Sequence, residues 1–169
     1  GERELLKEMA AMLQTEPAQL KEKIKALMET EGKLRRELEE VKREKALAEG
    51  EELFAGVREI GGRHYLVAKM TAASMELLRE NVDRFKAKFG SGVILLGAVQ
   101  DEKVHFVAGV TKDLTAKIQA GALVKQVAAI AGGGGGGRPE LAQAGGKNPA
   151  KLNEALREGE RLIQAGLEG

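Results

Sequence analysis

The stretch VILLGAVQDEKVHFVAGV, residues 93–110, decides the fold of this 169-residue chain. Residues 93–99 form a continuous apolar run of the kind that is buried on both faces of a sheet. After a turn at Asp101-Glu102, apolar residues occupy alternate positions, which is the period of a second strand. These alternating residues are Val104, Phe106, Ala108 and Val110. The stretch therefore predicts two strands joined by a tight turn.

The residues before this stretch have the pattern of two more strands and a helix. Residues 57–60 and 65–70 are predicted to be strands, joined by a turn at Gly61-Gly62. Ser74 is expected to cap a helix that ends at Gly90. The apolar face of this helix would consist of Leu78, Val82, Phe85 and Phe89. Strands that alternate with helices predict a small α/β or α+β domain with a mixed sheet and flanking helices, and they leave the order of the strands open.

The residues after this stretch predict two helices with a glycine run between them. Asp113 is expected to cap a helix, and residues 123–130 continue helically up to Gly132–Gly137. Asn148-Pro149 has the pattern of an N-cap and a first helical residue. The last helix would bury Leu152, Ala155, Leu156, Ile163 and Leu167. The glycine run is therefore predicted to be a loop between two folded elements, although a flexible linker has the same composition.

The glycine run and its flanks are the candidate binding site. Glycine leaves the backbone open to close approach. Positive charge at Arg138 and Lys147, with amides at Gln143 and Asn148, suits phosphates and the edges of sugars or bases. The predicted nucleic-acid-binding residues are Gly132, Gly133, Gly134, Gly135, Gly136, Gly137, Arg138, Gln143, Gly145, Gly146, Lys147 and Asn148. A phosphate-loop nucleotide site is excluded, because that motif needs glycine where Leu141 stands and Ser or Thr where Asn148 stands.

The first 50 residues have a heptad pattern. Apolar residues recur at every seventh position, namely Leu6, Leu13, Leu20, Leu27, Leu34, Val41 and Ala48. Thr15-Glu16-Pro17 interrupts the pattern and separates a short helix from a long one. The pattern predicts a helical arm over residues 1–50, before a globular domain over residues 51–169. The arm is either a helical hairpin or a coiled coil that pairs with a second copy of the chain.

Composition excludes several classes of function. The chain has no cysteine and only two histidines, so it offers no typical catalytic zinc site, and we expect no metal. Net charge is +1, but residues 103–169 hold nine Lys and Arg against six Asp and Glu, so the basic excess lies around the glycine run. No signal peptide or membrane span is apparent, which predicts a cytoplasmic protein. The opening Gly1-Glu2-Arg3, without an initiator methionine, suggests part of a longer protein.

Several motifs together resemble the C-terminal, DHH-associated domain of alanyl-tRNA synthetases. They are Lys112-Asp113-Leu114, AGALVK at 120–125, the glycine run with Arg138-Pro139, and AQAGG at 142–146. The resemblance implies a non-catalytic domain that contacts the outer corner of tRNA(Ala). That contact would support aminoacylation and editing by the catalytic and editing domains of a parent alanine–tRNA ligase. ATP, Mg and Zn would belong to those domains, and this fragment would need no cofactor.

Two other functions stay open at this stage. The same domain type follows the catalytic domains of some single-strand nucleases, where it helps to hold the substrate. In that branch a histidine commonly closes the glycine motif, and Arg138 stands there in this chain, which favours the synthetase branch. The other alternative is a helical oligomerisation module that forms a homodimer through the arm. Other single-stranded or structured nucleic acids are further possible ligands, and no membrane partner is expected.

Overall fold

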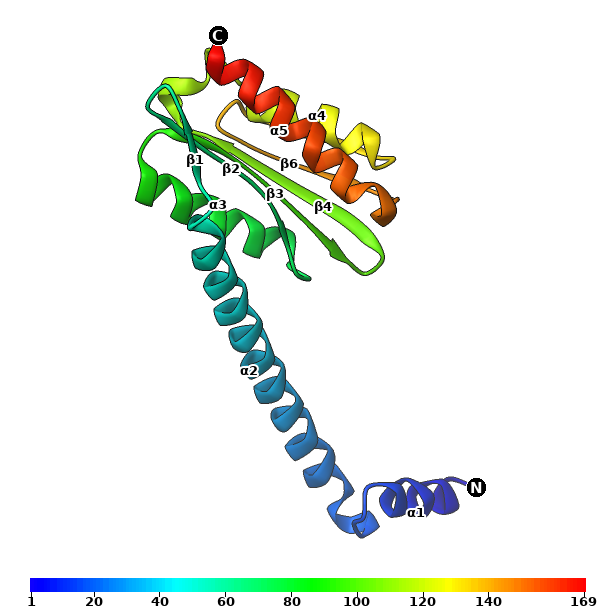
Figure 1. The fold of residues 1–169 in the computed structure, drawn as a ribbon. Helices are drawn as coiled ribbons and strands as arrows, with labels where there is room; N and C mark the ends of the chain where they lie inside the picture. The colour runs from blue at the N-terminus through cyan, green and yellow to red at the C-terminus, as the bar shows by residue number, and fades with distance from the viewer. The chain divides into compact units, whose positions relative to one another are not determined.

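The computed structural model describes residues 1–169 and contains two compact units (Figure 1). We call residues 1–43 the arm unit and residues 44–169 the sheet unit. The arm unit comprises α1 (Glu2–Met12), the 3-10 turn η1 (Pro17–Gln19) and the first part of α2 (Leu20–Phe54). The last part of α2 belongs to the sheet unit. No helix is both long enough and apolar enough to span a membrane.

The sheet unit contains six strands, three further helices and two 3-10 turns. In chain order they are β1 (Arg58–Ile60), β2 (Arg63–Met70), α3 (Met75–Phe89), β3 (Gly92–Gln100), β4 (Lys103–Val110), η2 (Lys112–Leu114), α4 (Ala120–Ile130), β5 (Gly134–Gly137), β6 (Leu141–Gly146), η3 (Pro149–Lys151) and α5 (Leu152–Glu168). The predicted mixed sheet with flanking helices is therefore confirmed.

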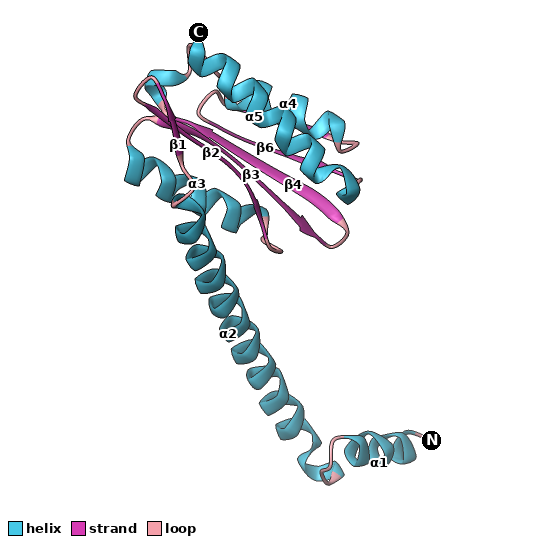
Figure 2. Ribbon diagram, viewed as in Figure 1, coloured by secondary structure: helices cyan, strands magenta, loops and turns pink.

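The strands form one sheet in the order β1-β2-β3-β4-β6-β5. Figure 2 shows this sheet from β1 through β4 to β6. Only β2 and β3 run parallel, because α3 connects them as a crossover helix. Every other neighbouring pair is antiparallel. The last two strands lie in the sheet in the reverse of their order in the chain. β6 pairs with β4, and β5 pairs only with β6. The glycine strand β5 is therefore one edge of the sheet.

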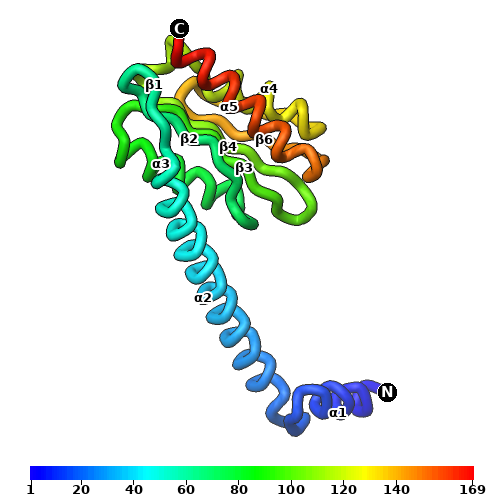
Figure 3. Tube along the Cα trace, in the orientation of Figure 1, coloured from blue at the N-terminus to red at the C-terminus, as the bar shows by residue number.

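Each face of the sheet is covered by its own layer of helices. On one face lie α4 and α5, side by side along the Cα trace (Figure 3). On the other face lie α3 and the last part of α2. Residues of β3 alternate between the two layers, with Val93 and Leu95 in one core and Ile94 and Leu96 in the other. The predicted burial of this strand on both faces is confirmed.

The caps of α3 agree with the prediction. Ser74 Oγ accepts a hydrogen bond from the backbone N–H of Leu77 at 3.2 Å. At the other end Gly90 has a φ of 73°, in the left-handed region that favours glycine. The prediction for Asp113 is wrong, since it lies in the short turn η2 and does not cap a helix. Its carboxylate instead accepts hydrogen bonds from Ser91 and Thr111.

The last part of α2 is fixed to α3 by polar and aromatic contacts. Asn81 Nδ2 donates to the Ala46 carbonyl at 3.3 Å, and the side chains of Arg84 and Glu51 form an ion pair at 2.5 Å. Phe54 packs edge-on against the ring of Phe85, with centroids 6.1 Å apart. These contacts make the end of α2 a part of the sheet unit.

The predicted glycine loop is wrong in one respect, because residues 134–137 form strand β5. Gly134 pairs with Gly145, and Gly137 pairs with Ala142. The N–H of Arg138 donates to the carbonyl of Leu141 at 3.0 Å and closes the turn between β5 and β6. A glycine run carries no side-chain period, so its pairing could not be read from the sequence.

The arm unit does not form a helical hairpin, which was one of the two predicted alternatives. The heptad residues of its long helix after Leu20 are exposed: Leu27 by 43%, Leu34 by 58% and Val41 by 60%. The short helix α1 contacts the turn η1, and the buried residues of the arm unit are Ala10 and Leu20. The eleven residues of α1 span only about 16 Å, which is too short to cover the heptad stripe as far as Val41.

Candidate nucleic-acid interface

The glycine strand β5 has two different faces. On the face toward α4, side chains have no room. A Cβ on Gly135 would lie 2.4 Å from the carbonyl oxygen of Gln143, and one on Gly133 would lie 1.8 Å from that of Gly145. Gly137 is confined in the same way, with Ala142 Cα at 2.8 Å. These three glycines are therefore required by close packing within the sheet unit.

The opposite face of β5 is open. A Cβ on Gly134 or on Gly136 would meet no atom within 4 Å. Neither residue has a positive φ, so neither packing nor backbone conformation requires glycine there. Glycine inside a strand weakens it, because glycine loses more backbone entropy and has no side chain to pack. These two glycines leave a strip of bare backbone on the surface.

The outer edge of β5 offers an unpaired backbone donor. Arg138 and Leu141 form a hydrogen-bonded pair in the turn, and such pairs alternate along an antiparallel ladder. Gly136 and Gly134 therefore direct their N–H and C=O groups toward β6. The N–H and C=O groups of Gly135 point away from the sheet. Such an N–H can donate to an anionic oxygen.

The turn between β5 and β6 is held from both sides. Ala120 N donates to the Pro139 carbonyl at 2.8 Å, from the start of α4. Lys86 Nζ donates to the Glu140 carbonyl at 2.8 Å, from α3. Burial lowers the pKa of the Lys86 ammonium, and the nearby Arg138 lowers it further. The carboxylates of Glu140 and Asp83 raise this pKa, but the effect of burial is larger. The sequence did not indicate Lys86 as part of the site, because 54 residues separate it from Glu140.

The remaining candidate residues divide into exposed and structural ones. The side chains of Arg138, Gln143, Lys147 and Asn148 are exposed. Gln143 pairs with Gly136 and lies on the same open face. Lys147 and Asn148 follow the end of β6, and the side chain of Asn148 forms no cap.

Two of the candidate glycines have local roles. Gly146 is buried, and a Cβ there would lie 2.6 Å from the Ala131 carbonyl oxygen. Gly132 has a φ of 73° directly after α4, a conformation that favours glycine. Both positions are explained by backbone geometry rather than by a ligand.

The structure brings together no metal-binding cluster. No group of three or more His, Asp or Glu side chains is placed to hold an ion. His64 contacts the Ser91 carbonyl through Nδ1 at 3.2 Å, and its ring packs against Phe89. The chemistry offered by the site is that of backbone amides, cations and amide side chains.

Comparisons with known proteins agree with this architecture. Residues 62–165 match the family described as the DHHA1 domain. The chain is 46% identical over 151 residues to an alanine–tRNA ligase of Cupriavidus necator, covering 89% of this chain and 17% of that protein. It is 46% identical over 153 residues to the alanine–tRNA ligase of Bacillus subtilis, covering 90% of this chain and 17% of that one. The chain thus spans about a sixth of the length of these relatives.

A solved structure has the same fold. The C-Ala domain of Aquifex aeolicus alanyl-tRNA synthetase superposes with a TM-score of 0.58 at 28% identity. The match covers 67% of this chain and 98% of the Aquifex domain. This chain belongs to the DHHA1 domain family, in the branch of the C-terminal domains of alanyl-tRNA synthetases. The predicted resemblance is confirmed, and the match to an isolated C-Ala domain agrees with a non-catalytic part of a ligase.

Proposed function

We propose that the sheet unit binds tRNA(Ala) through β5 and its flanks. The observation that carries this proposal is the bare backbone at Gly134 and Gly136, which neither packing nor φ requires. It lies beside the exposed cation Arg138. Phosphates need cations, and backbone that no side chain shields lets a strand approach closely. The alanine–tRNA ligase relatives indicate tRNA as the nucleic acid.

This binding would assist the reaction of a parent ligase, and the chain itself would carry out no chemistry. The domain would hold the outer corner of tRNA(Ala) while the catalytic and editing domains of the parent act on its acceptor end. ATP, Mg and Zn would be held by those domains. We expect elemental analysis of the dialysed chain to find no stoichiometric zinc.

The binding test uses Arg138→Ala and Lys147→Ala in the 169-residue chain. Each change should weaken binding of a tRNA(Ala) transcript in a gel shift. Each should also reduce the slope of log affinity against log salt concentration by about one unit, if the cation it removes meets one phosphate. The matched variants on the arm are Lys21→Ala, Lys25→Ala and Lys42→Ala. If only these arm variants failed to bind, the arm would be the RNA-binding surface and the proposal would be wrong.

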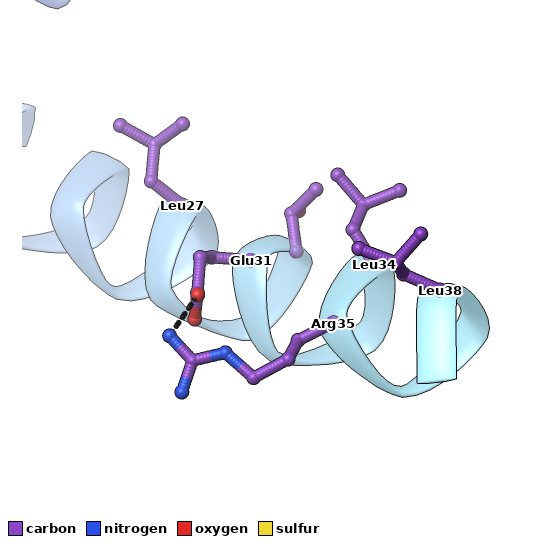
Figure 4. A pocket seen from close by; sticks show the side chains of 6 residues that line it. Leu27, Glu31, Leu34, Arg35 and Leu38 are labelled. Atoms are coloured by element: carbon purple, nitrogen blue, oxygen red, sulfur yellow. Dashed lines mark hydrogen bonds and ion pairs between the residues drawn. The ribbon is translucent and has the colours of Figure 1, made fainter. Parts of the chain in front are cut away.

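The arm unit supports a second function, pairing with another copy of the chain. Leu27, Leu34 and Leu38 form a continuous apolar groove along α2, next to the Glu31–Arg35 ion pair (Figure 4). All three leucines are more than 40% exposed, although the heptad pattern is that of a coiled-coil seam. A second α2 helix would cover this stripe, as the seam of a coiled coil requires.

The test for pairing is sedimentation of Leu27→Asp and Leu34→Asp. Each change puts a charge into the seam, so a dimer should dissociate. Ala26→Asp is the matched control, because Ala26 is exposed on the same helix and precedes the seam residue. A chain that sediments as a monomer before any substitution would contradict pairing.

A further inference from the structure

The face of the sheet toward α3 is covered only in part. α3 packs on β3 and β4, and Leu96 and Val107 are buried beneath this layer. Positions two residues apart on a strand share a face, so His105 and Gln143 lie on the α3 side. The registers place His105 beside Gly145 and Gly134, and Val107 beside Gln143 and Gly136. Beyond α3, this face of β4, β6 and β5 therefore presents Lys103, His105, Gln143 and three glycines.

Cations without a carboxylate partner surround this uncovered face. Lys103 shares the face of His105, is exposed and forms no ion pair. Arg79 precedes Lys86 by seven residues, so both lie on the same flank of α3. Arg79 is exposed and likewise forms no ion pair. Arg138 lies close enough to Lys86 to influence its pKa.

The direction of α3 places Arg79 on the side of Gly109 that is nearer the start of β4. α3 connects the parallel strands β2 and β3 and runs opposite to them, so it runs in the same direction as β4. The middle of α3 approaches Gly109, where a Cβ would meet Val82 and Lys86. Arg79 precedes Val82 by three residues, which is about 4.5 Å of helix, so Arg79 lies level with the middle of β4. Arg79, Lys103 and Arg138 thus border the uncovered face from three sides.

We propose that RNA lies across this α3-side face of β4, β6 and β5, and that Arg79 and Lys103 contact its phosphates. The proposal rests on the proposed function and assigns the face of the sheet and two residues outside the predicted set. Unpaired cations around bare backbone complement a polyanion. Asp101 and Glu102, the carboxylates nearest Lys103 in the sequence, form no ion pair with it. On the opposite face α4 packs against β5, so no ligand can lie there.

Charge removal gives the first test. Arg79→Ala and Lys103→Ala should each weaken binding of a tRNA(Ala) transcript by the 169-residue chain and reduce the salt slope by about one unit. Lys125→Ala is the matched control, because Lys125 is exposed on α4, in the opposite layer. Unchanged binding by the first two variants, with weaker binding by Lys125→Ala, would overturn the proposed face. If the unmutated chain bound no tRNA, both the proposed function and the proposed face would be wrong.

Added bulk gives a second test that is independent of charge. Gly136→Leu places a side chain in open space on the α3 side, so the chain should fold normally and bind tRNA more weakly. Ala122→Leu is the matched control, since Ala122 is exposed on α4. Thermal denaturation of both variants shows whether they are folded. Full affinity in a folded Gly136→Leu chain would exclude RNA from this face.

Discussion

Asp101 and Glu102 form the two-residue turn between β3 and β4, and both have left-handed backbone angles, with φ of 53° and 62°. Two positive φ values in such a turn are typical of type I′, which favours Asn-Gly. This conformation costs an L-residue with a side chain about 1–2 kcal/mol. The hairpin therefore forms in spite of its turn residues, because β3 and β4 are buried.

Glu102→Gly should raise the stability of the sheet unit. Glycine adopts a positive φ without steric cost, so the free energy of unfolding should rise by about 1 kcal/mol, less the entropy that glycine adds to the unfolded chain. Urea denaturation of the variant and the unmutated chain measures the difference. Glu102→Ala retains the strain and should show no gain. A lower unfolding midpoint for Glu102→Gly would contradict this account of the turn.

Asp113 gives the fold a dependence on acid pH. Hydrogen bonds from Ser91, and then from Thr111, lower the pKa of the Asp113 carboxyl. Because this pKa is lower in the folded chain than in the unfolded one, the stabilisation is complete above the ordinary value of about 4 and is lost as the pH falls below it. We therefore expect the unfolding free energy to decrease between neutral pH and pH of about 3.

Asp113→Asn tests the origin of this dependence. The variant should be less stable at neutral pH and should lose less stability on acidification, since it has no carboxylate to protonate. Urea denaturation at several pH values provides both numbers. Ser91→Ala should shift the dependence in the same direction, because Ser91 supplies the larger effect. Parallel stability profiles for Asp113→Asn and the unmutated chain would show that other groups cause the acid sensitivity.

At the scale of an element, β5 shows why a strand can consist of glycine. If residues 134–137 formed the predicted loop, valine would be tolerated at both Gly134 and Gly135. The structure requires different outcomes, because Gly135 faces the packed side of β5 and Gly134 the open side. Valine is therefore expected to be tolerated only at Gly134.

Gly135→Val should lower the unfolding free energy by about 1–3 kcal/mol, as overpacking does in a close-packed interior. Gly134→Val should change it by no more than about 0.5 kcal/mol, which is usual for exposed sites. Chemical denaturation distinguishes the two. Equal stability of the two variants would mean that Gly135 does not lie as close to Gln143 and Ala144 of β6 as described.

At the scale of the whole molecule, the arm unit and the sheet unit should be separable. Each of the two is a compact unit by itself. A chain of residues 44–169 should therefore melt at the same temperature as the sheet unit does in the full chain. Calorimetry of both chains tests this expectation.

The control for this truncation is a shorter chain, residues 55–169. It lacks Ala46 and Phe54, which are buried against α3, and it should melt at a lower temperature. If the two truncated chains were equally stable, the end of α2 would contribute nothing to the sheet unit. If residues 44–169 were unfolded, the division into two units would be wrong.

The sequence alone predicted those helices and strands whose apolar pattern or caps depend on neighbouring residues. The apolar run at 93–99, the alternation at 104–110 and the caps at Ser74 and Gly90 each depend on residues close together in the chain. The family could also be recognised, because its motifs at 112–114 and 142–146 are short contiguous strings.

Three features emerge only when the chain is folded: the edge position of β5, the exposure of the heptad stripe and the grouping of Lys86 with Glu140. Each depends on residues far apart in the chain or on an element that does not reach its expected partner. Glycine has no side chain to pattern, so pairing alone made residues 134–137 a strand with one packed face and one open face. The apolar period of a helix or strand indicates which of its sides is buried, but it does not indicate which other element covers that side.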